Sequence, residues 1–245
     1  MKLDILTALN SECAARRAAI VVTNVENGRQ RFVKAADVAK DSLRAALAEH
    51  LRTGKSGMVE SAEGPVFLTV YVPAPQLVIT GAVHISQALA PIGKLLGYDV
   101  TIVDPRTAFA SPGRFPDVTV IAEWPDTALP RLNVDRYTAF VALTHDPKID
   151  DPALTHALSR NCFYIGVLGS RKTHARRIER LKGQGISEAD IARIHAPIGL
   201  DISAVSPAEI AVAIMAQITD ELHEATEIEA AGERSAARPA ATAAS

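Results

Sequence analysis

The stretch Leu77-Val-Ile-Thr-Gly-Ala-Val-His84 decides the predicted fold, because a short apolar run is followed at once by a glycine turn and a helical pattern. Comparable apolar runs recur later in the chain, at residues 100–103, 118–121, 137–143 and 163–168. Strands that are apolar throughout and alternate with helices are typical of a parallel sheet covered on both faces. We therefore predict an α/β fold, with a Rossmann-like parallel sheet and helices on both faces, over residues 73–228.

The residues before and after this region have a different character. Pro73-Ala-Pro75 breaks the chain, and helical and strand patterns occur in residues 1–72, with a turn signal at Asn27-Gly28. We predict a small α+β module there. The Ala-rich residues 229–245 offer no bulky apolar side chain to bury and are predicted to form a disordered tail.

Composition excludes several classes of protein. The formal net charge is −2, which provides no electrostatic footprint for nucleic acid, and 48% of the residues are apolar, which supports a buried core. Two cysteines, Cys13 and Cys162, are too few for a disulfide framework or a cysteine-rich zinc site and suit a reducing compartment. No window approaches the roughly 18 apolar residues of a membrane span, and the N-terminus does not resemble a signal peptide. We expect a cytoplasmic protein.

The turn Gly81-Ala-Val-His84 matches a dinucleotide-binding fingerprint only in part. Gly81 opens the turn, and Asp104 supplies an acidic residue close to the required spacing of about 20 positions. Val83 and Ser86 occupy the positions of the second and third glycines, and a valine side chain would obstruct a pyrophosphate lying against bare backbone. The pattern favours the fold more than it favours NAD binding, and Gly81 can equally be a simple tight turn.

Two arginines, Arg106 and Arg114, follow Asp104 in the next loop. An aspartate in this place would accept a hydrogen bond from a ribose hydroxyl, whereas guanidinium groups favour phosphate or carboxylate through bidentate bonds. The alternative is a surface loop held together by Asp–Arg pairs.

A third polar turn, Thr144-His145-Asp146, follows the fourth strand of the predicted sheet. A metal site formed with Asp150 or Asp151 is a weak alternative, because carboxylates also cap helices, and we interpret Asp151 as such a cap. A histidine general base would need a nucleophile, and none stands at a telling spacing. We therefore predict ligand-binding residues here, with no catalytic residue and no metal site.

The stretch Gly169-Ser-Arg-Lys172 is the strongest signal for an anion. Gly169 permits close approach of the backbone, Ser170 can cap the following helix, and Arg171 and Lys172 add positive charge to the exposed N–H groups. Further arginines on the same helix are interpreted as a solvated polar face: Arg176, Arg177 and Arg180.

Two later features complete the pattern. Ser206-Pro-Ala-Glu209 is a capping box that predicts a helix continuing to about Glu227. Before it, Pro197-Ile-Gly-Leu-Asp201 places Asp201 in an otherwise apolar run, where a purely structural role is hard to assign.

Together these segments resemble the XdhC/CoxI family of molybdoenzyme maturation factors over residues 73–222. The stretches that carry the resemblance are Pro75-Gln-Leu-Val-Ile-Thr-Gly-Ala-Val-His84, Val103-Asp-Pro-Arg106, Arg114-Phe-Pro116, Leu143-Thr-His-Asp146, Tyr164-Ile-Gly-Val-Leu-Gly-Ser-Arg171, Pro197-Ile-Gly-Leu-Asp201 and Ser206-Pro-Ala-Glu-Ile-Ala211. The resemblance implies an accessory protein, rather than an enzyme, that binds molybdenum cofactor (molybdopterin) as cargo. It implies delivery to a molybdenum hydroxylase apoenzyme of the xanthine or carbon monoxide dehydrogenase type, with a cofactor sulfurase as a further partner.

An anionic, phosphate-bearing pterin suits glycine turns, a helix N-terminus and arginines. We expect the cofactor to be bound by residues of these turns: Gly81, His84, Asp104, Arg106, Arg114, Thr144, His145, Asp146, Gly169, Ser170, Arg171, Lys172 and Asp201. Two alternatives stay open. One is an NAD(P)-dependent oxidoreductase that uses Asp104 on a ribose, and the other is an adaptor that contacts an apoenzyme and binds no small molecule.

The N-terminal module departs from the family pattern. The family's amino-terminal domain carries a Gly-Gly-Cys segment, and residues 1–72 contain nothing like it. Cys13 is interpreted as a small buried apolar residue of an amphipathic helix, not as a ligand. The module is then expected to serve partner contact or the formation of a homodimer.

Overall fold

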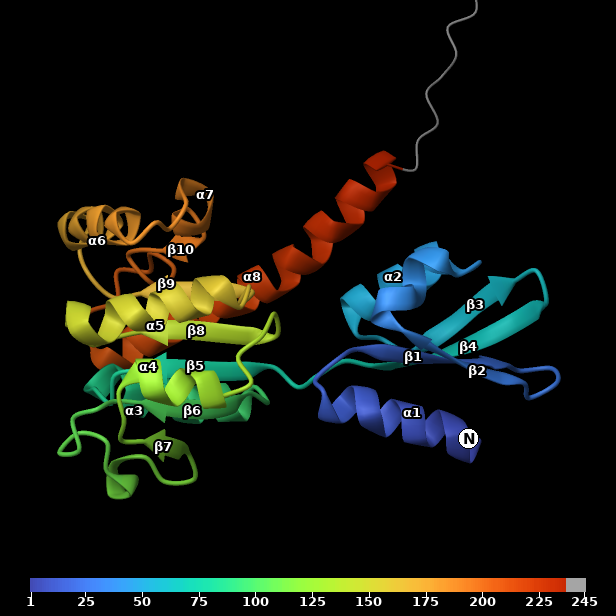
Figure 1. Cartoon of the computed structure of the whole chain (residues 1–245), viewed down its shortest axis with the longest axis horizontal. Coiled ribbons are helices and arrows are strands. Elements are labelled where there is room, and N and C mark those ends of the chain that lie inside the picture. The colour runs from blue at the N-terminus through green and yellow to red at the C-terminus, as the bar shows by residue number, and fades with distance from the viewer. Residues whose placement is uncertain (237–245) are drawn as a thin grey trace, which may run out of the picture. The chain divides into compact units, whose positions relative to one another are not determined.

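The computed structural model describes the backbone of residues 1–236 and the side chains of residues 1–223, and it divides into two compact units. Met1–Pro73 belongs to the first unit and Ala74–Glu224 forms the second, so the division falls within the Pro-Ala-Pro break. Each unit has its own sheet (Figure 1).

The first unit is built on an antiparallel sheet with the strand order β2-β1-β4-β3. Its elements are α1 (Leu3–Ala14), β1 (Ala19–Asn24), β2 (Gln30–Lys34), η1 (Ala35–Lys40), α2 (Arg44–Thr53), β3 (Gly57–Ser61) and β4 (Gly64–Tyr71). Strands β2 and β3 lie at the two edges and are largely polar or exposed, which explains why apolar patterning did not predict them. The predicted turn at Asn27-Gly28 does connect β1 and β2, with Gly28 at φ +69°.

Helices cover both faces of this antiparallel sheet (Figure 1). Ile20 and Val22 of β1 pack with Leu47 of α2 on one face, and α1 lies on the other. Because β1 is central, its residues from Ala19 to Val22 are buried on both faces.

Helix α1 does not present the predicted face to the sheet. Leu9 and Glu12 are buried while Cys13 is exposed, so the interpretation of Cys13 as a buried apolar residue is wrong. Glu12 is tolerated beneath the helix because Arg17 and Lys34 pair with it at 2.6 and 3.2 Å. The hydrogen bond from Arg17 is the main cause that lowers the pKa of Glu12 to about 2.

The second unit is built on a parallel sheet with the strand order β10-β9-β8-β5-β6-β7. Its strands are β5 (Gln76–Thr80), β6 (Asp99–Val103), β7 (Thr119–Ile121), β8 (Thr138–Ala142), β9 (Tyr164–Val167) and β10 (Ile194–His195). The predicted Rossmann-like parallel sheet is confirmed. The strand order reverses between β5 and β8, which is the point where such sheets open a crevice for ligands.

Successive side chains of each strand point to opposite faces and build two cores. The helical elements of this unit are α3 (His84–Leu95), η2 (Pro112–Arg114), α4 (Pro125–Ala128), η3 (Leu129–Arg131), α5 (Pro147–Ser159), α6 (Arg171–Gly183), α7 (Glu188–Ile191) and α8 (Pro207–Ala236). Leu77 and Ile79 pack with α3 and α8, whereas Val78 between them packs with α4, α5 and α6. Among the described residues, no helix combines the length and apolarity needed to cross a bilayer.

Helix α8 begins as predicted and extends further. Ser206 and Glu209 form the capping box, with N–H donors bonded to Ser206 Oγ at 3.2 Å and to Glu209 Oε2 at 2.8 Å. The helix is described as far as Ala236, beyond its predicted end at about Glu227, in a segment where alanine and glutamate favour helix. The rest of the predicted tail, residues 237–245, lies outside the described residues.

Candidate functional site

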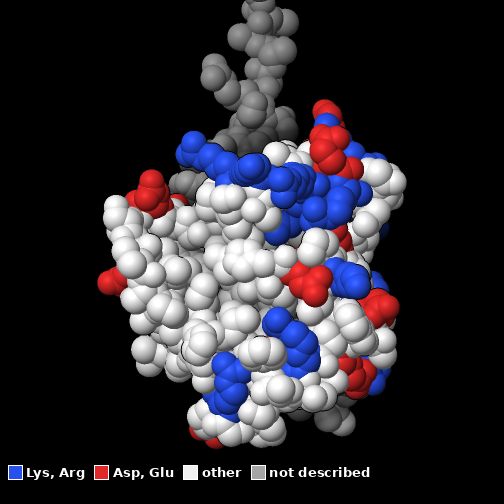
Figure 2. Space-filling model, turned by 90° about the vertical axis from the view of Figure 1, so that its left-hand side faces the viewer, with Lys and Arg blue, Asp and Glu red and all other residues white. Residues whose placement is uncertain are grey.

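The carboxyl ends of the parallel strands gather several polar turns at one edge of the sheet. The turns that begin at Gly81, Asp104, Leu143 and Leu168 directly follow β5, β6, β8 and β9. This edge lies at the left of Figure 1 and faces the viewer in Figure 2, where Lys and Arg side chains gather over α6. These four turns therefore lie at a common edge of the sheet, although the surroundings of their polar residues differ.

Both oxygens of the Asp104 carboxylate accept hydrogen bonds from nearby groups of the same chain. It has no exposed surface and accepts hydrogen bonds from Ala82 N at 2.7 Å and from Arg106 N and Nε at 2.9 Å. Arg106 Nη2 adds a fourth donor at 2.7 Å. Burial acts to raise the pKa of Asp104, but the hydrogen bonds from Arg106 and Ala82 outweigh it and the pKa is lowered. The ionised carboxylate thus ties the β5 and β6 turns together.

Arg114 is likewise used within the chain. Its Nη1 donates to the carbonyl oxygens of Ala82 and Phe109, both at 2.9 Å, and its Nη2 donates to Gln87 Oε1 at 3.0 Å. The guanidinium also lies 5.4 Å from the ring centre of Phe115. Arg114 therefore holds its loop against the first turn.

Gly81 is required by the backbone and by the neighbouring strand. Its φ is +108°, and a Cβ built on it would lie 2.8 Å from Thr144 Cγ2. Ser86, which stands at the third glycine position of the fingerprint, is fully buried and donates to the carbonyl of Gly81. These contacts bring the β5 and β8 turns together and explain Gly81 without a ligand.

The β8 turn is organised around Thr144. Its Oγ1 accepts from Asp146 N at 3.0 Å and donates to Asp150 Oδ1 at 2.6 Å. Asp146 caps α5 by accepting from Lys148 N at 2.9 Å, and the helix begins at Pro147. The side chains of Thr144 and Asp146 therefore hold the turn together and cap the start of α5.

The cap at Asp146 corrects the interpretation of Asp151. Both Asp146-Pro147 and Asp151-Pro152 fit a cap followed by a proline in the first helical position. The helix starts at the first of them, so Asp151 lies one turn inside α5, where it pairs with Arg180 at 2.5 Å. The identity of the cap depends on where β8 ends, which local pattern left undecided.

His145 stands exposed at the tip of this turn with a φ of +63°. Left-handed backbone is costly for a non-glycine residue, and strain of this kind is concentrated at binding sites. Within the part of the chain that the structure describes, no three His, Cys, Asp or Glu side chains come together as a metal site.

The β9 turn has the geometry predicted for an anion site. Gly169 has a φ of +138°, and α6 begins at Arg171 with Ser170 as its N-cap. Ser170 Oγ accepts from Thr173 N at 3.2 Å. The N–H groups of Arg171 and Lys172 belong to the first turn, so the helix itself offers them no partner. Their side chains are exposed and add positive charge to the same place.

Two buried residues beneath these turns were missed by sequence reasoning. Arg177 is 2% exposed, so its interpretation as part of a solvated face is wrong, and Asp150 is 1% exposed. Arg177 Nη2 donates to Leu168 O at 3.3 Å, but its Nε and Nη1, and Asp150 Oδ2, have no partner among the described residues. A signal was present, because Arg177 precedes the buried Leu181 by four positions and shares its helix face.

Burial dominates the electrostatics of this pair. It lowers the pKa of Arg177 and raises the pKa of Asp150, although the Thr144 hydroxyl and Arg177 act in the opposite direction on Asp150. Asp146 and Asp150 also act through space on Arg106, whose pKa is raised mainly by its bond to Asp104. The β6, β8 and β9 turns therefore lie within electrostatic reach of one another.

Asp201 belongs to a loop that is held against α8. Gly199 N donates to Gln217 Oε1 at 2.8 Å, and Leu200 N donates to Ala213 O at 3.1 Å. Asp201 lies beyond these bonds and is exposed, as is His84 at the start of α3. The structure places both residues after carboxyl ends of strands, and Asp201 follows the short strand β10.

Comparison with curated proteins finds relatives that match about three fifths of the chain. The chain is 34% identical over 155 residues to an uncharacterized protein, YqeB, of Escherichia coli K12. It is 30% identical over 154 residues to a protein of Bacillus subtilis 168 named as a probable xanthine dehydrogenase subunit, and 30% identical over 146 residues to the molybdenum cofactor insertion chaperone PaoD of E. coli K12. The matches span 62%, 62% and 60% of this chain but only 28%, 44% and 40% of these relatives.

Comparison with a solved structure and with a family profile adds evidence on the fold and on the family of this chain. A crystal structure described as a xanthine dehydrogenase from Bacillus halodurans superposes with a TM-score of 0.68 over 91% of this chain and 68% of that one. The two are 22% identical, so this likeness concerns the fold. The sequence profile of the XdhC Rossmann domain matches residues 77–218, which is more than half of the chain. The chain therefore belongs to the XdhC Rossmann domain family.

Proposed function

We propose that the chain binds molybdenum cofactor as cargo and delivers it to a molybdenum hydroxylase apoenzyme of the xanthine or carbon monoxide dehydrogenase type. The observation that carries this proposal is the capped start of α6 at the carboxyl edge of the sheet, with Gly169 and Ser170 before it. Family membership and the name of the relative PaoD, a cofactor insertion chaperone, support the choice of ligand.

The chemistry asked of the site is binding. The N–H groups and side chains of Arg171 and Lys172 hold the phosphate end, because a helix N-terminus carries partial positive charge and free donors. The β8 turn, with His145 at its exposed tip, orients the pterin end. Delivery follows when the apoenzyme competes for the same groups, and no step requires a catalytic residue.

The oxidoreductase alternative depends on a free aspartate after β6. Asp104 already accepts four hydrogen bonds and has no exposed surface, so no acceptor remains for a ribose hydroxyl. Val83 also stands where the fingerprint needs glycine. Titration of NAD(H) and NADP(H) against wild type and Val83→Gly tests this alternative, and micromolar binding to the wild type would support it.

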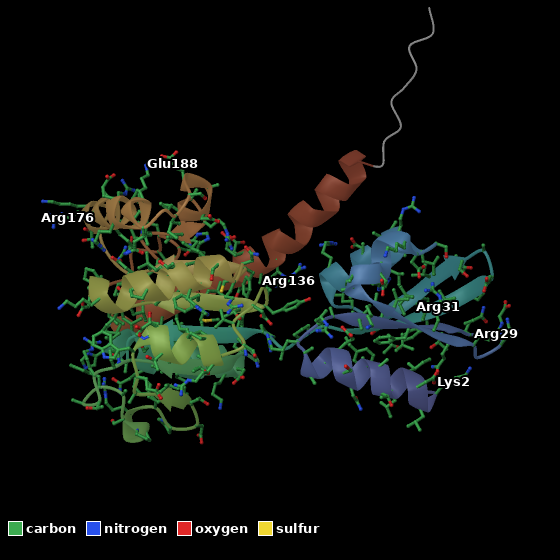
Figure 3. The ribbon with its side chains drawn as sticks, viewed as in Figure 1. Lys2, Arg29, Arg31, Arg136, Arg176 and Glu188 are labelled. Atoms are coloured by element: carbon green, nitrogen blue, oxygen red, sulfur yellow. The ribbon has the colours of Figure 1, made fainter. Side chains whose placement is uncertain are left out.

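The first experiment measures the fluorescence of oxidised pterin released from protein purified from a molybdopterin-producing host. Near-stoichiometric pterin is expected from the wild type. Arg171→Ala should weaken retention by about 1.5–3 kcal/mol, because a charge-assisted bond is lost. Arg176→Ala is the matched control, since Arg176 lies on the same helix and points away from the body of the unit (Figure 3). A wild type that carries no pterin contradicts the proposal.

A second experiment separates a carrier from an adaptor. The proposed carrier exchanges pterin for the apoenzyme, so apoenzyme capture should be accompanied by loss of pterin. Capture from cofactor-deficient cells, with no pterin on protein from normal cells, would instead support the adaptor. The same proposal places the chain in the cytoplasm, with a cofactor sulfurase as a partner and the N-terminal unit as a surface for the apoenzyme or a second copy.

A further inference from the structure

Arg177 is a buried cation that the protein does not neutralise by contact. Nearly all of its surface is covered, and two of its three guanidinium nitrogens have no hydrogen-bond partner among the described residues. Burying an unpaired charge is expensive, so such a residue is retained where something else uses the charge.

The guanidinium of Arg177 lies directly beneath the turn that opens α6. Its Nη2 donates to the carbonyl of Leu168, and it lies 3.9 Å from the position that a Cβ on Gly169 would occupy. Gly169 has no side chain and is half-buried, and Ser170 is exposed, so this turn gives a ligand access to the neighbourhood of the buried charge. A helix N-terminus and a buried cation thus lie next to one another at this turn.

The carboxylates near Arg177, Asp150 and Asp151, compensate its charge only in part and only through space. Asp151, one turn inside α5, is already paired with Arg180, and burial lowers the pKa of His174, which favours its neutral form. Asp150 uses Oδ1 for the Thr144 hydroxyl, and its Oδ2 has no hydrogen-bond partner in the part of the chain that the structure describes. Asp150 therefore opposes an incoming anion through space without forming an ion pair with Arg177.

We propose that Arg177 is the buried cation of a phosphate subsite at the Gly169–Ser170 turn, which takes the dianionic phosphate monoester of the ligand, and that Asp150 limits its affinity. This inference rests on the proposed function for the identity of the natural ligand. Arg177 acts through the turn as a positioning and specificity-determining residue, while the N–H groups of Arg171 and Lys172 make the contact.

The buried position gives Arg177 an effect that exposed cations cannot match. Charges separated by low-dielectric protein interact more strongly than charges separated by water, and salt screens them less. Arg171 and Lys172 are exposed and their attraction falls with ionic strength. A dianion gains more from a fixed charge than a monoanion does, so the subsite should prefer a phosphate monoester to a phosphate diester.

Calorimetric titration with inorganic phosphate and with phenyl phosphate, a simple monoester, tests the subsite in the full chain. Arg177→Met should weaken binding of both by about tenfold or more, because an attraction between charges across low-dielectric protein is lost. The matched control is Arg176→Met, which removes the same charge from an exposed position on the same helix and should leave affinity nearly unchanged. Asp150→Asn should tighten binding, because it removes the opposing charge while an oxygen remains for Thr144.

The design separates failure of the subsite from failure to fold. Methionine removes the charge of Arg177 while a flexible, unbranched side chain still fills the buried space, and circular dichroism checks the fold. A folded Arg177→Met with the affinity of Arg176→Met overturns the inference. If that variant does not fold, Asp150→Asn decides, and unchanged or weaker phosphate binding overturns the inference.

The same variants distinguish this inference from the proposed function. If the wild type retains pterin but phosphate affinity does not depend on Arg177, the subsite is contradicted and the proposed cofactor carrier is still supported. Wild type without pterin, but with phosphate binding that depends on Arg177 and Asp150, would support the subsite and remove the molybdopterin assignment.

Discussion

The two halves of the sheet edge both contain aspartates and arginines, but the hydrogen bonds of these residues are satisfied in one half and partly unsatisfied in the other. In the β5–β6 half, Asp104 and Arg106 meet in a bidentate pair, and Arg114 is bonded to backbone and side chain. In the β8–β9 half, Asp150 and Arg177 are almost fully buried, yet each has polar side-chain atoms that find no hydrogen-bond partner among the described residues. The pKa of Asp104 is lowered, whereas the pKa of Asp150 is raised.

The difference separates polar groups that build the fold from polar groups that remain available. A charge whose hydrogen-bonding capacity is filled by its own chain stabilises that chain and has little to offer a ligand. A buried charge with vacant donors or acceptors costs stability, and such a cost is typically found at functional sites. We therefore propose the β8–β9 half as the site of the phosphate end of the cargo, whereas the polar groups of the β5–β6 half hold their own turns together.

The largest effect on stability is expected for Gly81→Ala, which places a side chain between the β5 turn and the β8 turn, where the two halves meet. A Cβ at Gly81 would meet Thr144 Cγ2 at 2.8 Å with φ at +108°, so we expect a loss of about 3 kcal/mol in the free energy of unfolding. Urea unfolding measures it. Gly113→Ala is the control, since a Cβ there meets nothing within 4 Å. Equal stability of the two variants would show that the halves are not in contact.

Asp104→Asn tests the filled half. The amide cannot accept the bidentate pair from Arg106, and we expect a loss of about 2 kcal/mol at neutral pH, because breaking a buried pair leaves its partner unsatisfied. The pKa of Asp104 is lowered in the fold, so its contribution is present above the ordinary aspartate pKa of 3.8 and is lost as the pH falls below it. The stability difference between wild type and variant should therefore shrink in acid, in urea unfolding followed across pH. A difference that persists unchanged in acid would remove the ionised pair as its cause.

Asp150→Asn should act in the opposite direction. Burial raises the pKa of Asp150, so its ionised form costs stability above the ordinary value of 3.8, and that cost disappears as the pH falls. The variant is expected to be more stable than wild type at neutral pH, by on the order of 1 kcal/mol, because a desolvated charge is removed. The gain should vanish in acid. Loss of stability at neutral pH would mean that Asp150 is paired as fully as Asp104.

The smallest effect is expected for His145→Gly at the exposed tip of the β8 turn. Its φ of +63° suits glycine, so relief of left-handed strain should offset the greater entropy of the unfolded chain, and stability should change by less than about 1 kcal/mol. Released pterin should fall despite the unchanged fold. Full pterin retention would take His145 out of the proposed site.

Local pattern was sufficient for the order of the elements in the second unit. Runs such as Leu77–Thr80 are apolar on both faces, and the turn residues that follow them have strong preferences of their own, so strand, turn and helix could be assigned in sequence. Ser170 and Ser206 were predicted as helix caps on the same grounds, and both accept the expected bonds. The edge strands β2, β3 and β10 were not predicted, because they depend on a neighbouring strand for their hydrogen bonds.

The chain's sequence by itself determined the parallel α/β architecture, the positions of the polar turns and the family. Only the tertiary structure decided which polar residues are hydrogen-bonded within the chain. In the structure Asp104 pairs with Arg106, Asp146 rather than Asp151 caps α5, and Arg177 is buried next to Gly169. Periodicity and capping are properties of neighbouring residues along the chain, whereas the partners and the solvation of a charged side chain are set by whichever distant elements pack around it.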